Sequence, residues 1–85
     1  MKRPVRLIIT NPGQIGEILR GRRKARGVSQ AQLAQKLGVS QSRLSAIEAG
    51  TAALTVDRLI ALANVLDLQL VVQDKTSKPG PQTDW

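Results

Sequence analysis

The sequence contains no cysteine, no histidine, no phenylalanine and no tyrosine among its 85 residues, and only one tryptophan, Trp85. Without cysteine the chain has no disulfides and no thiolate zinc site, and without histidine it lacks the commonest general base and metal ligand. The hydrophobic core must therefore be aliphatic. The carboxylates, lysines and hydroxyls that remain form no recognisable nucleophile–base pair, so we expect no enzyme, no cofactor and no metal site.

Acidic residues are scarce, since 6 Asp and Glu stand against 13 Lys and Arg, for a net charge of +7. The excess lies at one end: residues 1–26 hold eight basic residues and a single acid, Glu17. A basic end on a small domain favours a polyanion, most often nucleic acid, with a solvated basic face or an anionic membrane surface as alternatives. No apolar run approaches a membrane span and no segment has the pattern of a signal peptide, so we expect a cytoplasmic protein.

Cap residues and apolar spacing predict the elements of one small domain. Four helices are expected within residues 11–27, 29–38, 40–50 and 55–66, capped by Asn11, Ser29, Ser40 and Thr55. Runs rich in β-branched residues predict short strands at Val5–Thr10 and Leu68–Gln73. We therefore divide the chain into an N-terminal arm (1–10), a helical domain (11–67), a dimerisation strand (68–74) and a polar, flexible C-terminal tail (75–85).

The two predicted helices that LGVS joins have the spacing of a helix-turn-helix. Ala34 must be small because the next helix crosses over it, and Gly38 can turn the chain sharply at positive φ. Val39, Leu44 and Ile47 then fill the angle between the helices. The pattern predicts a mainly α-helical bundle whose second motif helix enters the major groove of DNA. A helical hairpin that does not bind DNA is the alternative.

The exposed N-terminal part of that second helix carries side chains that can read bases. Glutamine pairs with adenine, arginine with guanine and serine with either, and the candidates are Ser40, Gln41, Ser42, Arg43 and Ser45. Gln41 is the first choice, since Ser40 also caps the helix and Arg43 can bind a phosphate instead. The candidates for phosphate contacts lie at a helix N-terminus or carry a positive charge: Ser29, Gln30, Arg20 and Lys24.

The stretch RKARGVSQAQLAQKLGVSQSRLSAIEAG, with the helix behind it, resembles the lambda-repressor-like, or XRE, family of DNA-binding domains. The resemblance covers about residues 12–66 and implies a compact helical bundle that binds palindromic operators in double-stranded DNA as a dimer. It also implies that Arg23 forms a structural ion pair with Glu48, at the end of the recognition helix, with a DNA contact by Arg23 as the alternative. Arg22 departs from the family, which usually has an apolar residue there.

The ends of the chain narrow the resemblance. The strand Leu68–Gln73 is too short to form a sheet alone, so its partner is expected to be the same strand of a second subunit, Val5–Thr10, or both, in an intersubunit β-lid. With a tail that ends in Trp85, this arrangement looks like the HipB antitoxins. The resemblance implies a homodimer that represses its own operon and restrains a HipA-like serine/threonine kinase toxin, with Trp85 docked in a pocket of the toxin. The alternative is a stand-alone XRE-type repressor of phage or plasmid type.

Overall fold

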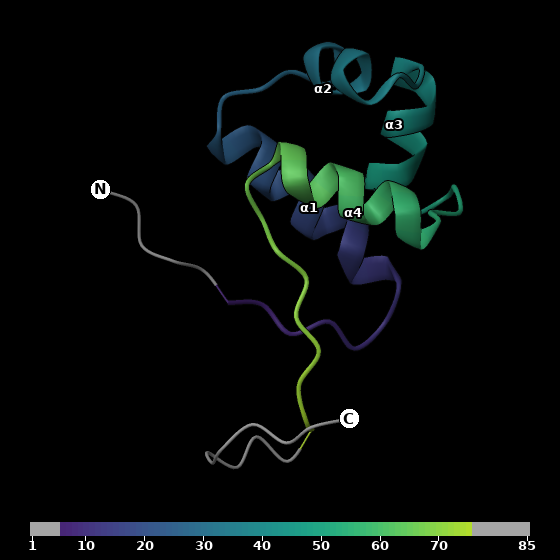
Figure 1. The fold of residues 1–85 in the computed structure, drawn as a ribbon. Helices are drawn as coiled ribbons and strands as arrows, with labels where there is room; N and C mark the ends of the chain where they lie inside the picture. Colours follow the sequence, from purple (N-terminus) through teal and green to yellow (C-terminus); the bar gives the residue numbers. More distant parts are fainter. Residues whose placement is uncertain (1–5, 76–85) are drawn as a thin grey trace.

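The computed structural model describes residues 6–75, which form a helical bundle with two extended ends (Figure 1). The helices are α1 (Gly13–Ala25), α2 (Gln30–Leu37), α3 (Gln41–Ala49) and α4 (Val56–Val65). α1 packs against α3, and α2 packs against both α3 and α4. This is the mainly α-helical bundle that the sequence predicts.

An aliphatic core holds the helices together. Its largest fully buried side chains come from α2, from α3 and from the end of α4: Leu33, Leu44, Leu62 and Leu66. Each contributes about 2 kcal/mol to folding relative to an exposed position. Ala34 and Ile47 belong to the same cluster, so the core lies directly beneath the α2–α3 pair and fixes the orientation of both helices.

The helix-turn-helix has the local geometry that its residues predict. Ser29 and Gln32 form a capping box: the Ser29 hydroxyl accepts from the Gln32 N–H at 3.0 Å, and Gln32 Oε1 accepts from the Ser29 N–H at 2.9 Å. Ser40 caps α3 and Thr55 caps α4 through their hydroxyls. Gly38 ends α2 at φ 72°, a left-handed conformation that strains any residue with a side chain. The predicted sharp turn is therefore confirmed.

The start of α1 differs from the prediction. The helix begins at Gly13 with Pro12 as its N-cap, and that cap makes no side-chain hydrogen bond, so Asn11 is not the capping residue. Pro12 has helical dihedrals, φ −62° and ψ −28°, as its predicted place at the start of the helix requires, but the Asn11 side chain makes no hydrogen bond within residues 6–75. The glutamine half of the predicted capping box is present, because Gln14 Oε1 accepts from the Asn11 N–H at 3.1 Å and from the Thr10 N–H at 2.6 Å. Gln14 thus ties the arm to the first turn of α1.

Neither extended segment that the structure describes, at residues 6–10 or 68–75, forms a strand in the single chain. Residues 6–75 contain no β-strand, so the strands predicted at Val5–Thr10 and Leu68–Gln73 are not formed here, and Val5 lies outside the described residues. The two ends touch through side chains, since the Arg6 guanidinium donates to Gln73 Oε1. Along their described lengths they share no backbone hydrogen bond. An extended segment becomes a strand only when a second backbone pairs with it, and the single chain supplies none.

Candidate nucleic-acid interface

The α2–α3 unit presents one face of α3 on a rigid base. The Val39 N–H donates to the Ala34 carbonyl at 3.0 Å and closes the turn after α2. Leu44 and Ile47 are buried on the inner face of α3, in the cluster that also holds Ala34. Because the core fixes α3 from beneath, its outer face can enter a groove without any rearrangement of the bundle.

The predicted base-reading side chains are all exposed. They come from the N-cap and the first half of α3: Ser40, Gln41, Ser42, Arg43 and Ser45. The Ser40 hydroxyl is already engaged, since it accepts from the Arg43 N–H at 3.0 Å. The Gln41 side chain makes no hydrogen bond within residues 6–75, so both ends of its amide are open to a base edge.

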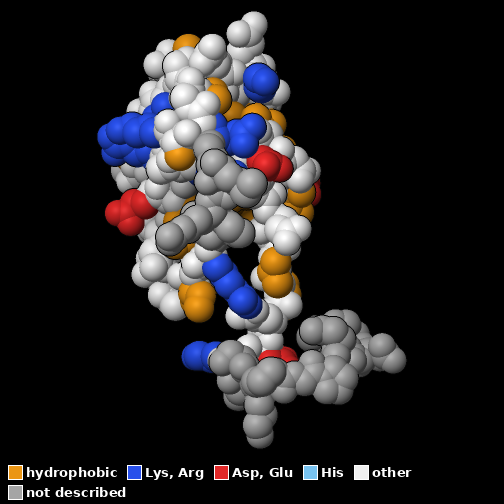
Figure 2. Space-filling view, turned by 90° about the vertical axis from the view of Figure 1, so that its left-hand side faces the viewer, with side chains coloured by type: hydrophobic (Ala, Val, Ile, Leu, Met, Phe, Trp, Pro, Cys, Tyr) orange, Lys and Arg blue, Asp and Glu red, His pale blue; other side chains and the backbone are white. Residues whose placement is uncertain are grey.

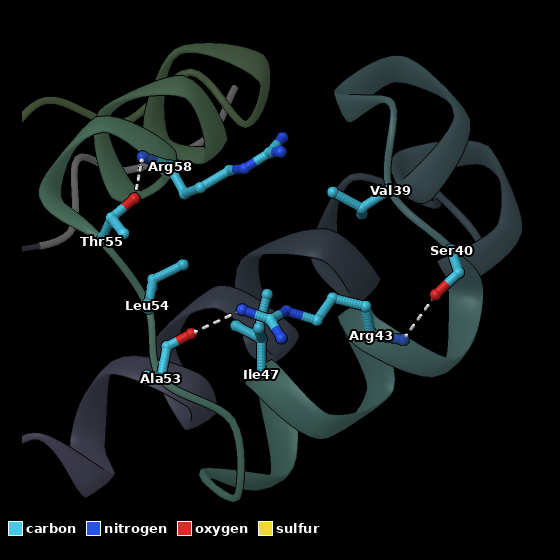
Figure 3. A pocket seen from close by; sticks show the side chains of 8 residues that line it. All are labelled: Val39, Ser40, Arg43, Ile47, Ala53, Leu54, Thr55 and Arg58. Carbon is cyan, nitrogen blue, oxygen red and sulfur yellow. Dashed lines mark hydrogen bonds between the residues drawn. The ribbon is translucent and has the colours of Figure 1, made fainter.

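Arg43 turns away from the other base-reading candidates. Its Nη2 donates to the carbonyl of Ala53, in the loop between α3 and α4, at 3.3 Å (Figure 3). The guanidinium therefore lies over that loop. A base contact by Arg43 requires the side chain to leave this carbonyl first.

A buried ion pair joins α1 to the end of α3. Arg23 Nε lies 2.7 Å from Glu48 Oε2, Arg23 Nη2 donates to Glu48 Oε1 at 3.0 Å, and Arg23 Nη1 donates to the Val28 carbonyl at 2.9 Å. The hydrogen bond to Glu48 raises the pKa of Arg23. Burial is the largest single effect and raises the pKa of Glu48, but the hydrogen bonds from Arg23 and Gln30 and the positive charges of Arg23 and Arg20 together lower it by more, so the net pKa is lowered. Both groups stay charged, and Arg23 is held inside the bundle.

The side chain of Gln30 belongs to the same network. Its Nε2 donates to Glu48 Oε1 at 3.0 Å, so the amide points into the bundle. The Ser29 hydroxyl is likewise used by the capping box. Backbone N–H groups in the first turn of α2 are then the donors best able to meet a phosphate at this helix end.

Basic side chains gather where α1 ends, on the face of the bundle that Figure 2 presents. Arg20 and Lys24 are exposed and lie one helical turn apart. Arg20 is near enough to Glu48 to help lower its pKa, so this row runs beside the end of α3. Arg22 points elsewhere, because its Nε donates to the Leu66 carbonyl at 3.1 Å. That bond explains the arginine at a usually apolar position: its head satisfies a carbonyl at the end of α4.

The structure adds two residues to this region that the sequence pattern does not identify. Gly16 lies where α1 meets the end of α3, and a Cβ there would stand 2.5 Å from the Glu48 carbonyl oxygen and 2.7 Å from that of Ile47. Arg58, in the first turns of α4, donates from Nη1 to the Leu37 carbonyl at 3.0 Å. Periodicity assigns both to helices but does not show what lies across from them. The one available signal was a glycine inside a helix, which costs stability unless packing requires it.

One predicted site residue is not described by the structure. Trp85, the expected partner anchor, lies outside the described residues. Between residues 6 and 75 no helix is long and apolar enough to cross a bilayer, and no three acidic side chains come together as metal ligands do. The features that can meet DNA are thus concentrated on α2, α3 and the end of α1.

Known proteins share this arrangement. A family model described as helix-turn-helix matches residues 19–72. The uncharacterized HTH-type transcriptional regulator y4dL of Sinorhizobium fredii is 37% identical over 66 residues, which make up 78% of this chain and 34% of that protein. The chain therefore spans about a third of the length of this relative.

Two solved structures have a similar fold. SinR, the master regulator for biofilm formation, solved in complex with DNA, is 36% identical with a TM-score of 0.60, over 65% of this chain and 89% of the SinR chain. A chain of the HipA–HipB–O2–O3 complex is 25% identical with a TM-score of 0.71, over 81% of this chain and 97% of that chain. With a family match over more than half of its length, the chain belongs to the XRE-type helix-turn-helix family of DNA-binding transcriptional regulators.

Proposed function

We propose that this chain is a DNA-binding antitoxin, which represses its own operon as a homodimer and restrains a HipA-like serine/threonine kinase toxin. One observation carries the proposal: among these structures, the likeness to the chain from the HipA–HipB–O2–O3 complex extends over 81% of this chain and the likeness to SinR over 65%, while the sequence match to y4dL covers 78%. The helix-turn-helix match spans only residues 19–72. The longer likeness must therefore include part of the ends, where the partner and dimer contacts are proposed.

On the DNA side, α3 lies in the major groove of a palindromic operator. Gln41 reads an adenine edge, because its amide is exposed and has no other partner among the residues that the structure describes. Ser42 and Ser45 offer hydroxyls along the same face, and the first turn of α2 meets a phosphate through its backbone N–H groups. Arg20 and Lys24 add a row of positive charge toward the backbone of the duplex.

The apolar ends support a homodimer. Both extended segments expose large aliphatic side chains: Leu7, Ile8, Ile9, Leu70, Val71 and Val72. Extended apolar chain with unpaired backbone groups is a template for another strand, and a second copy offers the same segment about a two-fold axis. Pairing of the two C-terminal segments gives the intersubunit β-lid. It would set two recognition helices about 34 Å apart, one turn of DNA.

Trp85 is the proposed anchor for the toxin. It is the single aromatic side chain of the protein, and the three residues before it in the sequence, QTD, are polar. Tryptophan is among the side chains most enriched at binding hot spots, where it fills a pocket of the partner. An anchor of this kind needs no further structure around it.

A stand-alone XRE-type repressor is the second candidate. The sequence identities favour it, since y4dL at 37% and SinR at 36% exceed the 25% of the HipA–HipB–O2–O3 chain. Under this alternative the operator contacts are unchanged and Trp85 has no protein partner. The two candidates therefore differ in one measurable property, the capture of a kinase.

A paired pull-down tests the choice. The baits are the full chain, its Trp85→Ala variant and a chain ending at Lys75, each exposed to a lysate of the source cells and read by mass spectrometry. We expect a kinase-like protein on the full chain and its loss from both altered baits. Equal capture of the kinase by all three baits would support the antitoxin function but contradict the proposed anchor role of Trp85. The lysate should come from cells that also express the genes next to the gene of this protein, so that a neighbouring toxin would be present. Recovery of DNA alone from such a lysate would establish the stand-alone repressor.

A further inference from the structure

A cleft of about 340 Å³ lies beside α3, between that helix and the start of α4 (Figure 3). Its apolar lining comes from Val39, Ile47 and Leu54, and its charge comes from Arg43 and Arg58. No acidic residue lines it. The cleft is thus an apolar hollow flanked by two cations, next to the face of α3 proposed to read bases.

Both arginines line this cleft. Arg43 reaches from α3 toward the loop before α4, and Arg58 reaches from α4 toward the end of α2 (Figure 3). Arg43 Nη2 donates to the Ala53 carbonyl at 3.3 Å, and Arg58 Nη1 donates to the Leu37 carbonyl at 3.0 Å. Within residues 6–75 neither arginine has a carboxylate in salt-bridge range. A guanidinium has five N–H donors, so each arginine keeps several for a ligand. Two like charges beside one hollow with no counter-charge make a site for an anion.

The position of the cleft indicates which anion. The proposed contact of α2 lies at the start of that helix, where Gln30 bonds to Glu48, whereas the cleft runs along α3 from Ser40 to Ile47 on the side of the α3–α4 loop. A helix in the major groove has a phosphate backbone on either side, because the groove is only about 12 Å wide. A contact from the start of α2 and a contact from the cleft beside α4 can therefore reach the two different backbones that border the groove.

We propose that Arg43 and Arg58 clamp one phosphodiester of the operator, on the strand opposite to the one that α2 contacts. The inference rests on the proposed DNA binding and deepens it. It assigns Arg58 to the interface and gives Arg43 a phosphate in place of a base. Arginine suits the task, since its planar fork can hold two phosphate oxygens at once.

Salt dependence tests the clamp. The probe is a duplex that the full chain enriches from a random-sequence pool, compared with a random duplex, with affinity measured by fluorescence anisotropy from about 50 to 200 mM salt. We expect Arg58→Gln to weaken binding to both duplexes by the same factor and to flatten the slope of log affinity against log salt by about 0.9. Between about 50 and 200 mM salt, the Arg58→Gln variant should therefore lose roughly three- to four-fold less affinity than the unaltered chain loses.

Three further variants separate a phosphate contact from other effects. Arg26→Gln removes the same charge from a residue that faces Asp67, at 3.8 Å, and should leave the slope nearly unchanged. Arg58→Lys should restore most of the slope. Gln41→Ala should show the opposite signature, with a roughly 5- to 150-fold loss on the enriched duplex and little change on the random one.

A scan of neutral methylphosphonates along the enriched duplex locates the phosphate. One substitution should weaken the unaltered chain strongly and the Arg58→Gln and Arg43→Gln variants little. The clamp is wrong if Arg58→Gln matches Arg26→Gln in slope, or if it changes the preferred base at one position. If the unaltered chain enriches no duplex at all, the proposed operator binding fails and the clamp fails with it, which is a separate and visible outcome.

Discussion

At the scale of single residues, Glu48 is the side chain on which the recognition helix depends most. It stands at the end of α3 and accepts hydrogen bonds from Arg23 Nε, Arg23 Nη2 and Gln30 Nε2, so one carboxylate joins α1 and α2 to α3. A buried ion pair adds little net stability compared with a well-packed apolar pair, but removal of one partner is costly. The pair therefore acts mainly by allowing one orientation of α3.

The first prediction concerns the charge of Glu48. Its folded pKa lies below its unfolded value, so the carboxylate stabilises the fold above the unfolded pKa and stops doing so as pH falls through the folded pKa. We expect Glu48→Gln to lower the free energy of unfolding by about 2–3 kcal/mol at pH 7. The gap should narrow as pH falls below the unfolded value of about 4.5, because the unfolded chain then takes up a proton, and it should close as pH falls through the lower folded pKa.

Urea unfolding followed by circular dichroism, at several pH values, measures this gap. The difference in the free energy of unfolding between the unaltered protein and Glu48→Gln removes the contribution of the other carboxylates, because both proteins contain them. Glu17→Gln is a suitable control, because it makes the same substitution at an exposed position of α1 and should change the free energy of unfolding only slightly. A gap for Glu48→Gln that stays constant from pH 7 to below pH 4 would show that its charge does not contribute.

At the scale of elements, the sequence predicts the helices well because their determinants are local. Ser29, Gln32 and Gly38 set the ends of α2 within a few residues of themselves, and each behaves as its position in the chain indicates. The strands are a different case, since a strand depends on a second backbone that can lie in another subunit. Arg22 shows the same limit, because its partner at Leu66 is 44 residues away and is fixed only by tertiary structure.

The contact between α1 and α3 gives the second prediction. A Cβ on Gly16 would come within 2.5 Å of the Glu48 carbonyl oxygen, which belongs to backbone and cannot rotate away. We expect Gly16→Ala to destabilise the fold by about 1–3 kcal/mol and to weaken operator binding, since α3 must shift to make room. Thermal unfolding and the anisotropy assay measure the two effects.

Gly21→Ala, in the same helix, is the matched control. A Cβ at Gly21 meets nothing within 4 Å, so alanine there should stabilise α1 by about 0.5–1 kcal/mol through its helix propensity. The two substitutions add the same methyl group and should act in opposite directions. Similar effects at both positions would mean that the approach of α1 to α3 does not constrain the fold.

At the scale of the whole molecule, the proposed surfaces for DNA and for protein partners are separate. The extended ends leave the bundle on the side away from α2, as Figure 1 shows. Contacts between subunits can then form at the described extended segments while α3 stays in the groove. This separation is what an autorepressor with a protein partner requires, because the operator and the partner can be held at once.

The last prediction concerns the dimer. Val71 is 66% exposed on the C-terminal segment, and a charge there opposes burial in a β-lid. We expect light scattering at micromolar concentration to give twice the chain mass for the unaltered protein and the single-chain mass for Val71→Asp, with much weaker operator binding. Val56→Asp is the control, since Val56 is 68% exposed on α4 and an acid in the first turn of a helix is favourable. Loss of the dimer through Val56→Asp, with Val71→Asp unaffected, would place the subunit contact on α4, and a single-chain mass for the unaltered protein would exclude the lid.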